Sequence, residues 1–461
     1  MARMVAEPLD PADDDEVSRQ RRDLVRGAFA HAWEAYEMKA FGKDEVKPLT
    51  GAGADVMGLG LTLVDALDTM LIMGMQNTSA FRRARDWVRD ELTAAPQADV
   101  SVFECSIRVL GGLLSAHALS GDPGFRDKAR MIGLGLLAAF DTPSGLPASV
   151  INLAQPAKRA FINPYNGHKN NFGDPSTLAE AGSIQLEMQF LSHVTRDARF
   201  ARRADESIAK LLSLALPAPA KTAAPGAAGL PLFPVDLHPR EGRFVSDRIS
   251  TGAGGDSFYE LLLKQTLMRP FSLRHLTPAV ANITRALFER TGGKVPGAPA
   301  LHFLGASTVA GKAPQKKMEH LSCFAPGMLA LYAHKTAPPP AGGEAGGERA
   351  WALGLAEATM RTCMEMYRVT RTGLAAEAYE IVGGSPKLVP LAKQRYSLLR
   401  PEAVESAFVL WRVTGKKEYR EFGWAVFQVS ACLCCSLCCS LALCVALEEF
   451  EHVCVCAVCM P

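Results

Sequence analysis

The chain has 461 residues, and its 50 basic and 48 acidic side chains give a formal net charge of +2. This balance gives no case for a nucleic-acid or acidic-lipid partner, and we expect no nucleic acid among its partners. With 48% hydrophobic and 21% charged residues, the chain can bury a large core and is not expected to be disordered.

The cysteines divide the chain into two compositions. Of twelve, only Cys105, Cys323 and Cys363 precede residue 432, and the other nine lie in the last thirty residues. The stretch Phe422 to Leu447 carries no charge and is long enough for the roughly 20 residues of a membrane-spanning helix. Residues 1–21 lack the apolar core of a secretory signal, so we expect a flexible leader without a visible signal or anchor. Membrane association through the tail or through an absent N-terminal anchor is one hypothesis.

Apolar periodicity predicts an all-α protein. Apolar residues recur at spacings of three and four, the pattern of helices with one buried face, and alternating runs typical of strands are scarce. The expected helices cover Arg22 to Phe41, Leu59 to Met73, Phe103 to Leu119, Leu178 to Val194, Ser257 to Met268 and Pro401 to Val413.

A helix end, a polar turn and an aromatic residue that opens the next helix recur along the chain. Asp122 and Asp197 are the expected N-caps, and Phe125, Phe200 and Tyr419 the expected first-turn anchors. Such hairpins cannot bury their apolar faces alone, so they predict one toroid of stacked helical hairpins.

We expect three parts along the chain: the leader 1–21, a helical domain 22–424 and a Cys-rich apolar tail 425–461. Residues 216–234 and 337–349 are rich in Pro, Gly and Ala. Both are expected to be surface insertions, because neither composition can pack a core.

The chemical signal comes from carboxylates in apolar or glycine-rich surroundings. Glu104 lies one helical turn before Arg108, a spacing that also fits an ordinary ion pair. Asp256 follows a glycine-rich loop and, on local grounds, is the N-cap of the next helix. Glu402 and Glu405 fall in a first helical turn, where acids favour the helix dipole. Each residue has a structural explanation, and only convergence on one pocket would make the set unusual.

Seven blocks, in this order, resemble the signature blocks of glycoside hydrolase family 47, the class I α-1,2-mannosidases that trim asparagine-linked glycans. The resemblance runs from about residue 24 to about residue 424. It implies an (α/α)7 barrel, incomplete here at its C-terminal end, and inversion at the anomeric carbon. The blocks are GLTLVDALDTMLIMGM, FECSIRVLGGLLSAHALSGD, LAEAGSIQLEMQFLSHVT, GAGGDSFYELLLKQ, MEHLSCFAPGMLAL, GLAAEAYEI and LLRPEAVESAFVLWRVTG.

The resemblance also implies roles for individual residues. Glu104 matches the general acid, Glu402 the general base and Asp256 an assisting carboxylate. An inverting glycosidase needs two carboxyl groups roughly 6.5–9.5 Å apart, so that a water fits beside the sugar. The implied substrate-binding residues are Arg108, Glu187, His320, Glu377, Arg400 and Glu405.

Cys323 and Cys363 match the family's disulfide, which belongs to an oxidising lumen. The resemblance therefore implies the lumen or membrane of the endoplasmic reticulum or Golgi. The sequons at Asn77 and Asn282 fit such a compartment, and Cys105 is expected to be a buried free thiol.

The family binds Ca²⁺ at the barrel floor through a C-terminal threonine, and no threonine follows Thr414 here. Calcium takes oxygen ligands and the tail's thiols are soft, so we expect no metal ligands in this sequence. The tail has three open interpretations: a mis-predicted gene end, a membrane or acylated anchor, or a thiol-rich metal binder.

Two principal function hypotheses follow. The first is an inverting mannosyl-oligosaccharide 1,2-α-mannosidase that trims high-mannose N-glycans on glycoproteins. The second is a catalytically impaired glycan-binding relative without the calcium site. A third hypothesis makes the chain a tail-anchored membrane protein.

Overall fold

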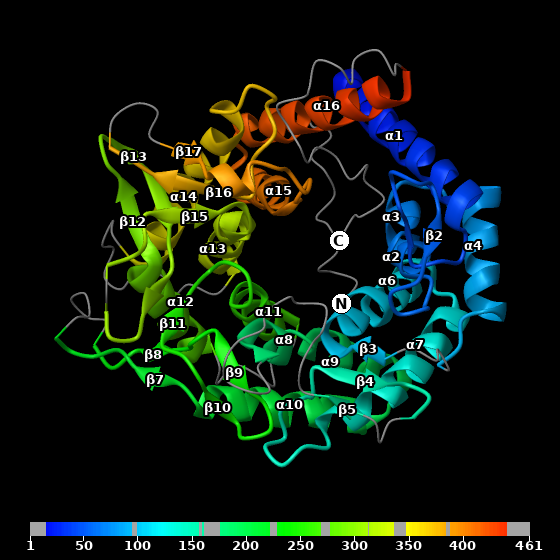
Figure 1. Ribbon diagram of the computed structural model, residues 1–461, viewed down its shortest axis with the longest axis horizontal. Coiled ribbons are helices and arrows are strands. Elements are labelled where there is room, and N and C mark those ends of the chain that lie inside the picture. The colour runs from blue at the N-terminus through cyan, green and yellow to red at the C-terminus, as the bar shows by residue number, and fades with distance from the viewer. Residues whose placement is uncertain are drawn as a thin grey trace.

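The computed structural model describes residues 15–94, 99–155, 159–160, 176–221, 228–268, 277–311, 313–335, 347–383 and 388–439. Helices alternate between an outer and an inner layer around one ring (Figure 1). The outer helices are α1 (Glu16–Ala40), α4 (Ser79–Asp90), α7 (Pro123–Leu136), α10 (Ala198–Ser213), α12 (Thr277–Thr291), α14 (Glu348–Arg368) and α16 (Lys417–Cys439). The inner helices are α2 (Leu61–Asp65), α3 (Leu67–Ile72), α6 (Gly111–Ser120), α8 (Leu178–Gly182), α9 (Gln185–Thr195), α11 (Asp256–Met268), α13 (Ala325–Lys335) and α15 (Glu402–Thr414).

The predicted hairpins are present. Helices α6 and α7, α9 and α10, and α15 and α16 pack against each other in pairs. Asp122 accepts from the amide of Gly124 at the start of α7, and Asp197 accepts in the same way at the start of α10. The aromatic anchors Phe125, Phe200 and Tyr419 are buried, so each fixes an outer helix on the core.

Two predicted helices are interrupted. The helix expected over residues 59–73 is split at Ala66 into α2 and α3, and the one over 178–194 is split into α8 and α9. The helix expected over 103–119 runs without a break from Val102 to Ser120. Its middle is π-helical: η2 (Cys105–Leu110) lies between α5 (Val102–Glu104) and α6.

Short antiparallel strands join the helices at the rim of the ring, and the sequence analysis did not locate them. The longest is β13 (Ala298–Leu304), which pairs with β12 (Gly292–Val295). The others are β1 (Glu45–Val46), β2 (Gly53–Ala54), β3 (Asp99–Ser101), β4 (Val150–Asn152), β5 (Arg159–Ala160), β6 (Ser176–Thr177), β7 (Leu216–Pro217), β8 (Pro231–Leu232), β9 (Asp236–His238), β10 (Arg243–Phe244), β11 (Arg248–Ile249), β14 (Ser307–Thr308), β15 (Lys317–Glu319), β16 (Ala378–Ile381) and β17 (Leu388–Pro390).

The expectation that residues 216–234 cannot pack a core is wrong in part. Strands β7 and β8 form a hairpin at the two ends of this segment, and Leu232 and Phe233 are buried in the core. Phe233 stacks at a tilt against Phe258 of α11, with ring centroids 5.1 Å apart. Residues 222–227, the middle of the first expected insertion, and 336–346, which include the first ten residues of the second, lie outside the described residues.

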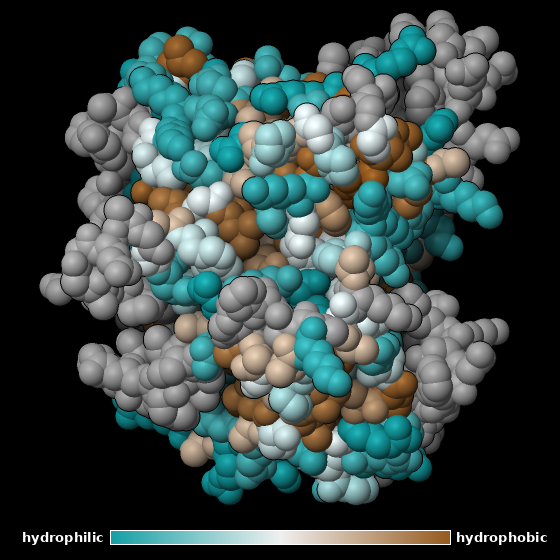
Figure 2. All heavy atoms as spheres, turned by 90° about the vertical axis from the view of Figure 1, so that its left-hand side faces the viewer, coloured by the Kyte–Doolittle hydropathy of each residue, from teal (hydrophilic) through white to brown (hydrophobic). Residues whose placement is uncertain are grey.

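The core lies between the two helical layers, in two clusters. One is built mainly from the first 204 residues, and the other joins residues from Leu146 to Phe422. On the outer face, hydrophobic side chains form several separate areas between hydrophilic ones (Figure 2).

The ends of the helical domain differ from the expected boundaries. Helix α1 begins at Glu16, inside the expected leader, and α16 continues past residue 424 to Cys439. Residues 440–461 lie outside the described residues, so the predicted incompleteness of the barrel stays a prediction. Among the described residues, one helix, Val102–Ser120, is long and apolar enough to cross a membrane, and 50% of its apolar window is buried within the protein.

The first and last described helices close the outer layer. Arg21 of α1 donates two hydrogen bonds to the carboxylate of Glu421 of α16, at 2.9 and 2.7 Å. Its guanidinium carbon also lies 4.9 Å from the ring centroid of Trp424. This contact joins parts of the chain that are 400 residues apart in sequence.

We predict that a double-mutant cycle of Arg21→Ala and Glu421→Ala yields a favourable coupling of about 0.5–1 kcal/mol in the free energy of unfolding, because bidentate geometry is the best case for an exposed pair. Arg21 lowers the pKa of Glu421, mainly through a hydrogen bond. The coupling is therefore present above pH 4.5, the ordinary Glu value, and is lost as pH falls through the lower folded-state pKa. The Arg83–Glu37 pair joins α1 to α4 and not to α16, so it is the reference for an ion pair that does not link the two ends of the domain. A coupling of zero at pH 7 contradicts the prediction.

Candidate active site

Glu104 and Arg108 form the predicted ion pair, and the structure adds a third member. Arg108 Nε donates to Glu104 Oε2 at 2.7 Å, and Arg108 Nη1 contacts Asp65 Oδ2 at 3.3 Å. We call these three residues the Arg108 cluster. Burial raises the pKa of Asp65 to about 7, against the lowering effect of Arg108. The sequence analysis missed Asp65, although a carboxylate inside the apolar run LTLVDALDTMLIM was a signal.

A glycine brings the two helices of the Arg108 cluster together. A Cβ on Gly112 of α6 would lie 2.8 Å from the carbonyl oxygen of Val64, so only glycine allows this approach. Asp65 follows Val64 at the end of α2 and therefore reaches Arg108. The π-helical turn η2 holds Arg108 in the same region, and such turns are frequent at functional sites.

The second group of charges comes from α11 and α15. Lys264 Nζ contacts Glu260 Oε1 at 2.5 Å and Glu405 Oε1 at 3.6 Å. Burial alone would lower the pKa of Lys264, but the charges of Glu260 and Glu405 outweigh it and raise the pKa. Glu260, Lys264 and Glu405 line a small cavity between α11, α13 and α15.

Asp256 and Glu402 are two buried carboxyl groups with raised pKa values. Burial raises the pKa of each to about 7, and the charge of Asp256 contributes to the shift of Glu402. Asp256 is the first residue of α11, so its expected position as the N-cap is wrong by one residue. Its Oδ1 accepts from the amide of Ser257 at 2.7 Å. Glu402 Oε2 is buried and has no hydrogen-bond partner among the described residues.

A three-stranded sheet brings His320 beside Glu377. Glu319 of β15 pairs with Ala378 of β16, and the next residues outward are His320 and Glu377. The His320 amide donates to the Glu377 carbonyl at 2.9 Å. Burial, with the charge of Arg400 adding to it, lowers the pKa of His320 to about 3, so its ring is neutral at pH 7.

Arg400 forms an ion pair with Glu377 and lies two residues before the start of α15. Its Nε donates to Glu377 Oε2 at 2.7 Å, whereas Glu377 Oε1 is buried without a partner in the described part of the chain. The preceding residue, Leu399, has a φ of 54°, a left-handed conformation that is strained for leucine. Strained backbone of this kind clusters at functional sites. We call Asp256, Glu260, Lys264, His320, Glu377, Arg400, Glu402 and Glu405 the acidic wall.

Glu187 of α9 lies beside the turn that carries Arg108 and is influenced by the charge of Lys264 in the acidic wall. Its carboxylate lies 3.8 Å from the position that a Cβ on Gly111 would take, and Gly111 directly follows η2. The positive charge of Lys264 acts to lower the pKa of the Glu187 carboxyl group. Burial raises the pKa of Glu187 to about 7, and its Oε2 has no partner among the residues described.

The nine predicted catalytic and substrate-binding residues therefore lie in the Arg108 cluster, in the acidic wall or, in the case of Glu187, beside the turn η2. Their roles stay predictions, because geometry alone does not assign them. Asp65, Glu260 and Lys264 were not among the predicted residues. Glu260 and Lys264 follow Asp256 at helical spacing within the block GAGGDSFYELLLKQ, and that spacing was the available signal.

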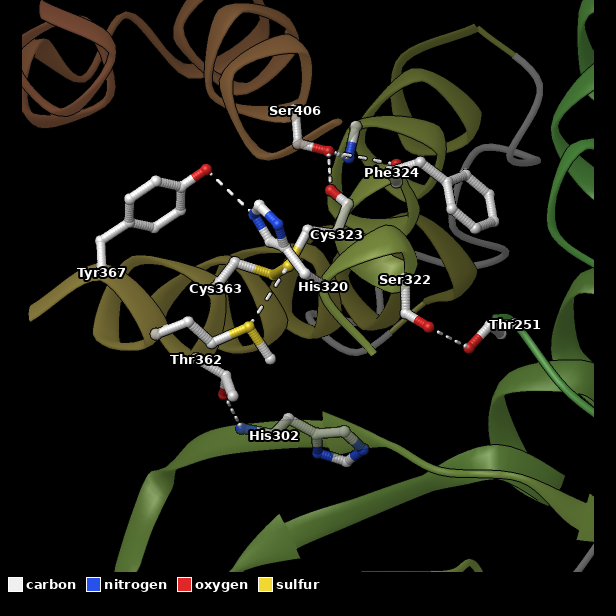
Figure 3. The surroundings of a disulfide bond; sticks show 12 residues. Thr251, His302, His320, Ser322, Cys323, Phe324, Thr362, Cys363, Tyr367 and Ser406 are labelled. Atoms are coloured by element: carbon white, nitrogen blue, oxygen red, sulfur yellow. Dashed lines mark hydrogen bonds between the residues drawn. A yellow bond between two sulfur atoms is a disulfide. The ribbon is translucent and has the colours of Figure 1, made fainter. Parts of the chain in front are cut away.

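The disulfide between Cys323 and Cys363 is present, as the resemblance implied. It joins η6 (His320–Phe324), which follows β15, to α14 (Figure 3). Cys105 is a buried free thiol, as expected, and burial raises its pKa to about 12.

A calcium ion needs several ligand groups around one point. In the described ranges, no three His, Cys, Asp or Glu side chains come close enough to share one metal ion. No step proposed below passes through a metal.

The shape of the chain matches solved sugar-processing enzymes. The α-1,2-mannosidase from Trichoderma reesei superposes with a TM-score of 0.73 over 89% of this chain and 84% of that one, at 23% identity. A cellobiose 2-epimerase from Spirochaeta thermophila superposes with a TM-score of 0.53 over 79% of this chain and 84% of its own, at 10% identity. The same fold thus serves different reactions, and the family has to come from the sequence.

The fold is that of an (α/α)-barrel protein. The chain belongs to glycosyl hydrolase family 47, whose sequence profile matches residues 28–441. The expected (α/α)7 barrel is thereby confirmed. The profile extends beyond residue 424, where the resemblance was expected to end.

Two relatives illustrate the match. The chain is 37% identical to mannosyl-oligosaccharide 1,2-alpha-mannosidase MNS1 of Arabidopsis thaliana over 91% of its own length. It is 36% identical to the endoplasmic reticulum mannosyl-oligosaccharide 1,2-alpha-mannosidase of Rattus norvegicus over 89% of its length. The match covers 69% of the plant protein and 58% of the rat protein.

The buried carboxylates predict an unusual dependence of stability on pH. The pKa of Glu187 is 4.5 in its ordinary state and about 7 when folded, so the folded state holds a proton that the unfolded state has lost. The unfolding free energy must therefore fall as pH rises from about 4.5 to about 7. We expect Glu187→Gln to be more stable than the parent by about 1–3 kcal/mol at pH 8 and equal to it at pH 4.

Urea denaturation at the two pH values measures this difference. The control is Glu206→Gln, whose exposed side chain pairs with Arg203 and should leave stability unchanged at both values. A Glu187→Gln variant that is less stable than the parent at pH 8 contradicts the interpretation.

Proposed function

We propose that this chain is an inverting mannosyl-oligosaccharide 1,2-α-mannosidase that removes α-1,2-linked mannose from high-mannose N-glycans. The observation that carries the proposal is the match of residues 28–441 to glycosyl hydrolase family 47, in a chain that buries Asp256 and Glu402. Relatives at 34–37% identity are named as mannosyl-oligosaccharide 1,2-alpha-mannosidases, which supports this substrate.

In the proposed mechanism Glu402 is the general base. Its pKa of about 7 suits a group that must accept a proton near neutral pH. Its unpartnered Oε2 can take the proton of a water that attacks the anomeric carbon. Asp256 assists, because its charge raises the proton affinity of Glu402.

Glu104 is the proposed general acid. Arg108 Nε holds Glu104 Oε2 at 2.7 Å, which fixes the orientation of the carboxyl group. The other oxygen can then pass a proton to the leaving oxygen, directly or through a water. The two carboxyl groups act from opposite sides of the sugar ring, and the released mannose has the inverted configuration.

Arg108, Glu187, His320, Glu377, Arg400 and Glu405 are the proposed contacts for the mannose hydroxyls. Buried oxygens of Glu187 and Glu377 have no partner among the described residues, so each can accept a hydroxyl proton. The neutral ring of His320 offers one donor or acceptor in the same region.

The proposed location is the lumen of the endoplasmic reticulum or Golgi. The Cys323–Cys363 disulfide fits an oxidising compartment, and several relatives are named as endoplasmic reticulum mannosidases. Family membership is also consistent with a calcium requirement.

Replacement of the acid or the base tests the proposal. We expect Glu104→Gln and Glu402→Gln each to lower kcat for release of free mannose from an oligomannose glycan by about 10²–10⁴-fold. The matched control is Glu289→Gln on the outer helix α12, which also removes a carboxylate paired with an arginine four residues before it. Full turnover by Glu104→Gln contradicts the proposal.

Glycan binding without turnover is the second candidate function. The soft cysteine thiols that follow residue 431 favour it, because calcium takes oxygen ligands. Calorimetric titration with an oligomannose glycan, metal analysis and a mannose assay on one preparation separate the two candidates. Binding without bound calcium and without released mannose selects the second candidate, whereas released mannose selects the first.

A further inference from the structure

Tyr367, at the end of α14, lies against His320 of η6. The two rings meet edge to face with centroids 5.3 Å apart, and the Tyr367 hydroxyl is 2.9 Å from His320 Nε2. Both side chains are buried, with exposed fractions of 6% and 1%. Figure 3 shows the hydroxyl directed at the imidazole ring.

Two surrounding bonds hold this pair in place. The disulfide links Cys363, one helical turn before Tyr367, to Cys323, three residues after His320. Ser406 of α15 donates to the Cys323 carbonyl at 2.5 Å, which ties η6 to the helix that carries Glu402. The two rings therefore keep one relative position (Figure 3).

The two possible proton arrangements differ in how many buried polar groups they leave unpaired. His320 Nδ1 is buried and has no hydrogen-bond partner in the described part of the chain. If Tyr367 donates to Nε2, the proton of the neutral ring is on Nδ1, and only this N–H lacks a partner. If Nε2 donates to Tyr367, both the tyrosine O–H and the Nδ1 lone pair lack partners. Because buried unpaired groups are costly, the first arrangement is favoured.

We propose that Tyr367 is a positioning residue whose O–H donates to His320 Nε2, so that the ring is held with its proton on Nδ1 as the donor for a sugar hydroxyl oxygen. This proposal rests on the proposed function, which makes His320 a substrate contact. Tyr367 itself does not touch the sugar. It acts by fixing both the orientation and the tautomer of the histidine, as the second partner of a functional histidine commonly does.

Proton–nitrogen NMR correlation of the full chain with isotope-labelled histidine tests the proposal. His320 signals are assigned by their loss in His320→Asn. We expect the parent to show the Nδ1–H tautomer and Tyr367→Phe to show a mixture. We also expect KM for α-1,2-mannobiose to rise about threefold to tenfold in Tyr367→Phe, the size of one lost hydrogen bond, with a smaller change in kcat.

Tyr332→Phe is the matched control. This buried tyrosine of α13 has its hydroxyl 3.3 Å from Glu348, outside the acidic wall, so its removal should leave the His320 signals and KM unchanged. A parent protein with the Nε2–H tautomer overturns the proposal, and this measurement needs no variant. An unchanged tautomer in Tyr367→Phe also overturns it. If the expected tautomers appear in a chain that releases no mannose, the positioning role stands and the proposed function fails.

Discussion

Several carboxylates have to stay together inside the helical ring although burial and mutual repulsion oppose their ionisation. The chain meets this constraint with three cations that each contact one or two acids. Arg108 holds Glu104 and Asp65, Lys264 holds Glu260 and Glu405, and Arg400 holds Glu377. These contacts do not neutralise the whole set. Asp65, Glu187, Asp256 and Glu402 keep raised pKa values of about 7.

This electrostatic arrangement depends on the ring. Asp256 and Glu402 lie on α11 and α15, two inner helices that are far apart in sequence and belong to one ring (Figure 1). Close helix contacts such as that at Gly112, and the Arg21–Glu421 contact between the first and last described helices, hold that arrangement. Buried oxygens of Glu187, Glu377 and Glu402 have no hydrogen-bond partner among the described residues, which costs stability and suits binding and catalysis.

Local signals in the sequence predicted much of the helical architecture. Asp122 and Asp197 marked helix starts because N-capping depends on neighbouring residues only. The break at Ala66 and the strands β15 and β16 were not predictable in this way, since packing and sheet register decide them. The register matters for the site, because it brings His320 to Glu377. The composition of residues 216–234 predicted a surface insertion and gave no sign that Phe233 is buried.

The site shows the same division. The local sequence marked the Glu104–Arg108 pair, Asp256 and Glu402 as candidates, and the family resemblance supplied their roles and the Cys323–Cys363 bond. The contacts of Asp65 and Tyr367 could be found only in three dimensions. Their partners, Arg108 and His320, lie more than 40 residues away in the chain.

The configuration of the first released sugar tests the central claim most directly. If Glu402 activates a water on the face of the sugar opposite to Glu104, hydrolysis of an α-1,2-linked mannoside must release β-mannose first. Proton NMR of the anomeric signals at the start of the reaction, before mutarotation, measures this. We predict that the β-mannose signal appears first and that α-mannose follows by mutarotation. Release of α-mannose first, or no release of mannose by the folded chain, contradicts the account.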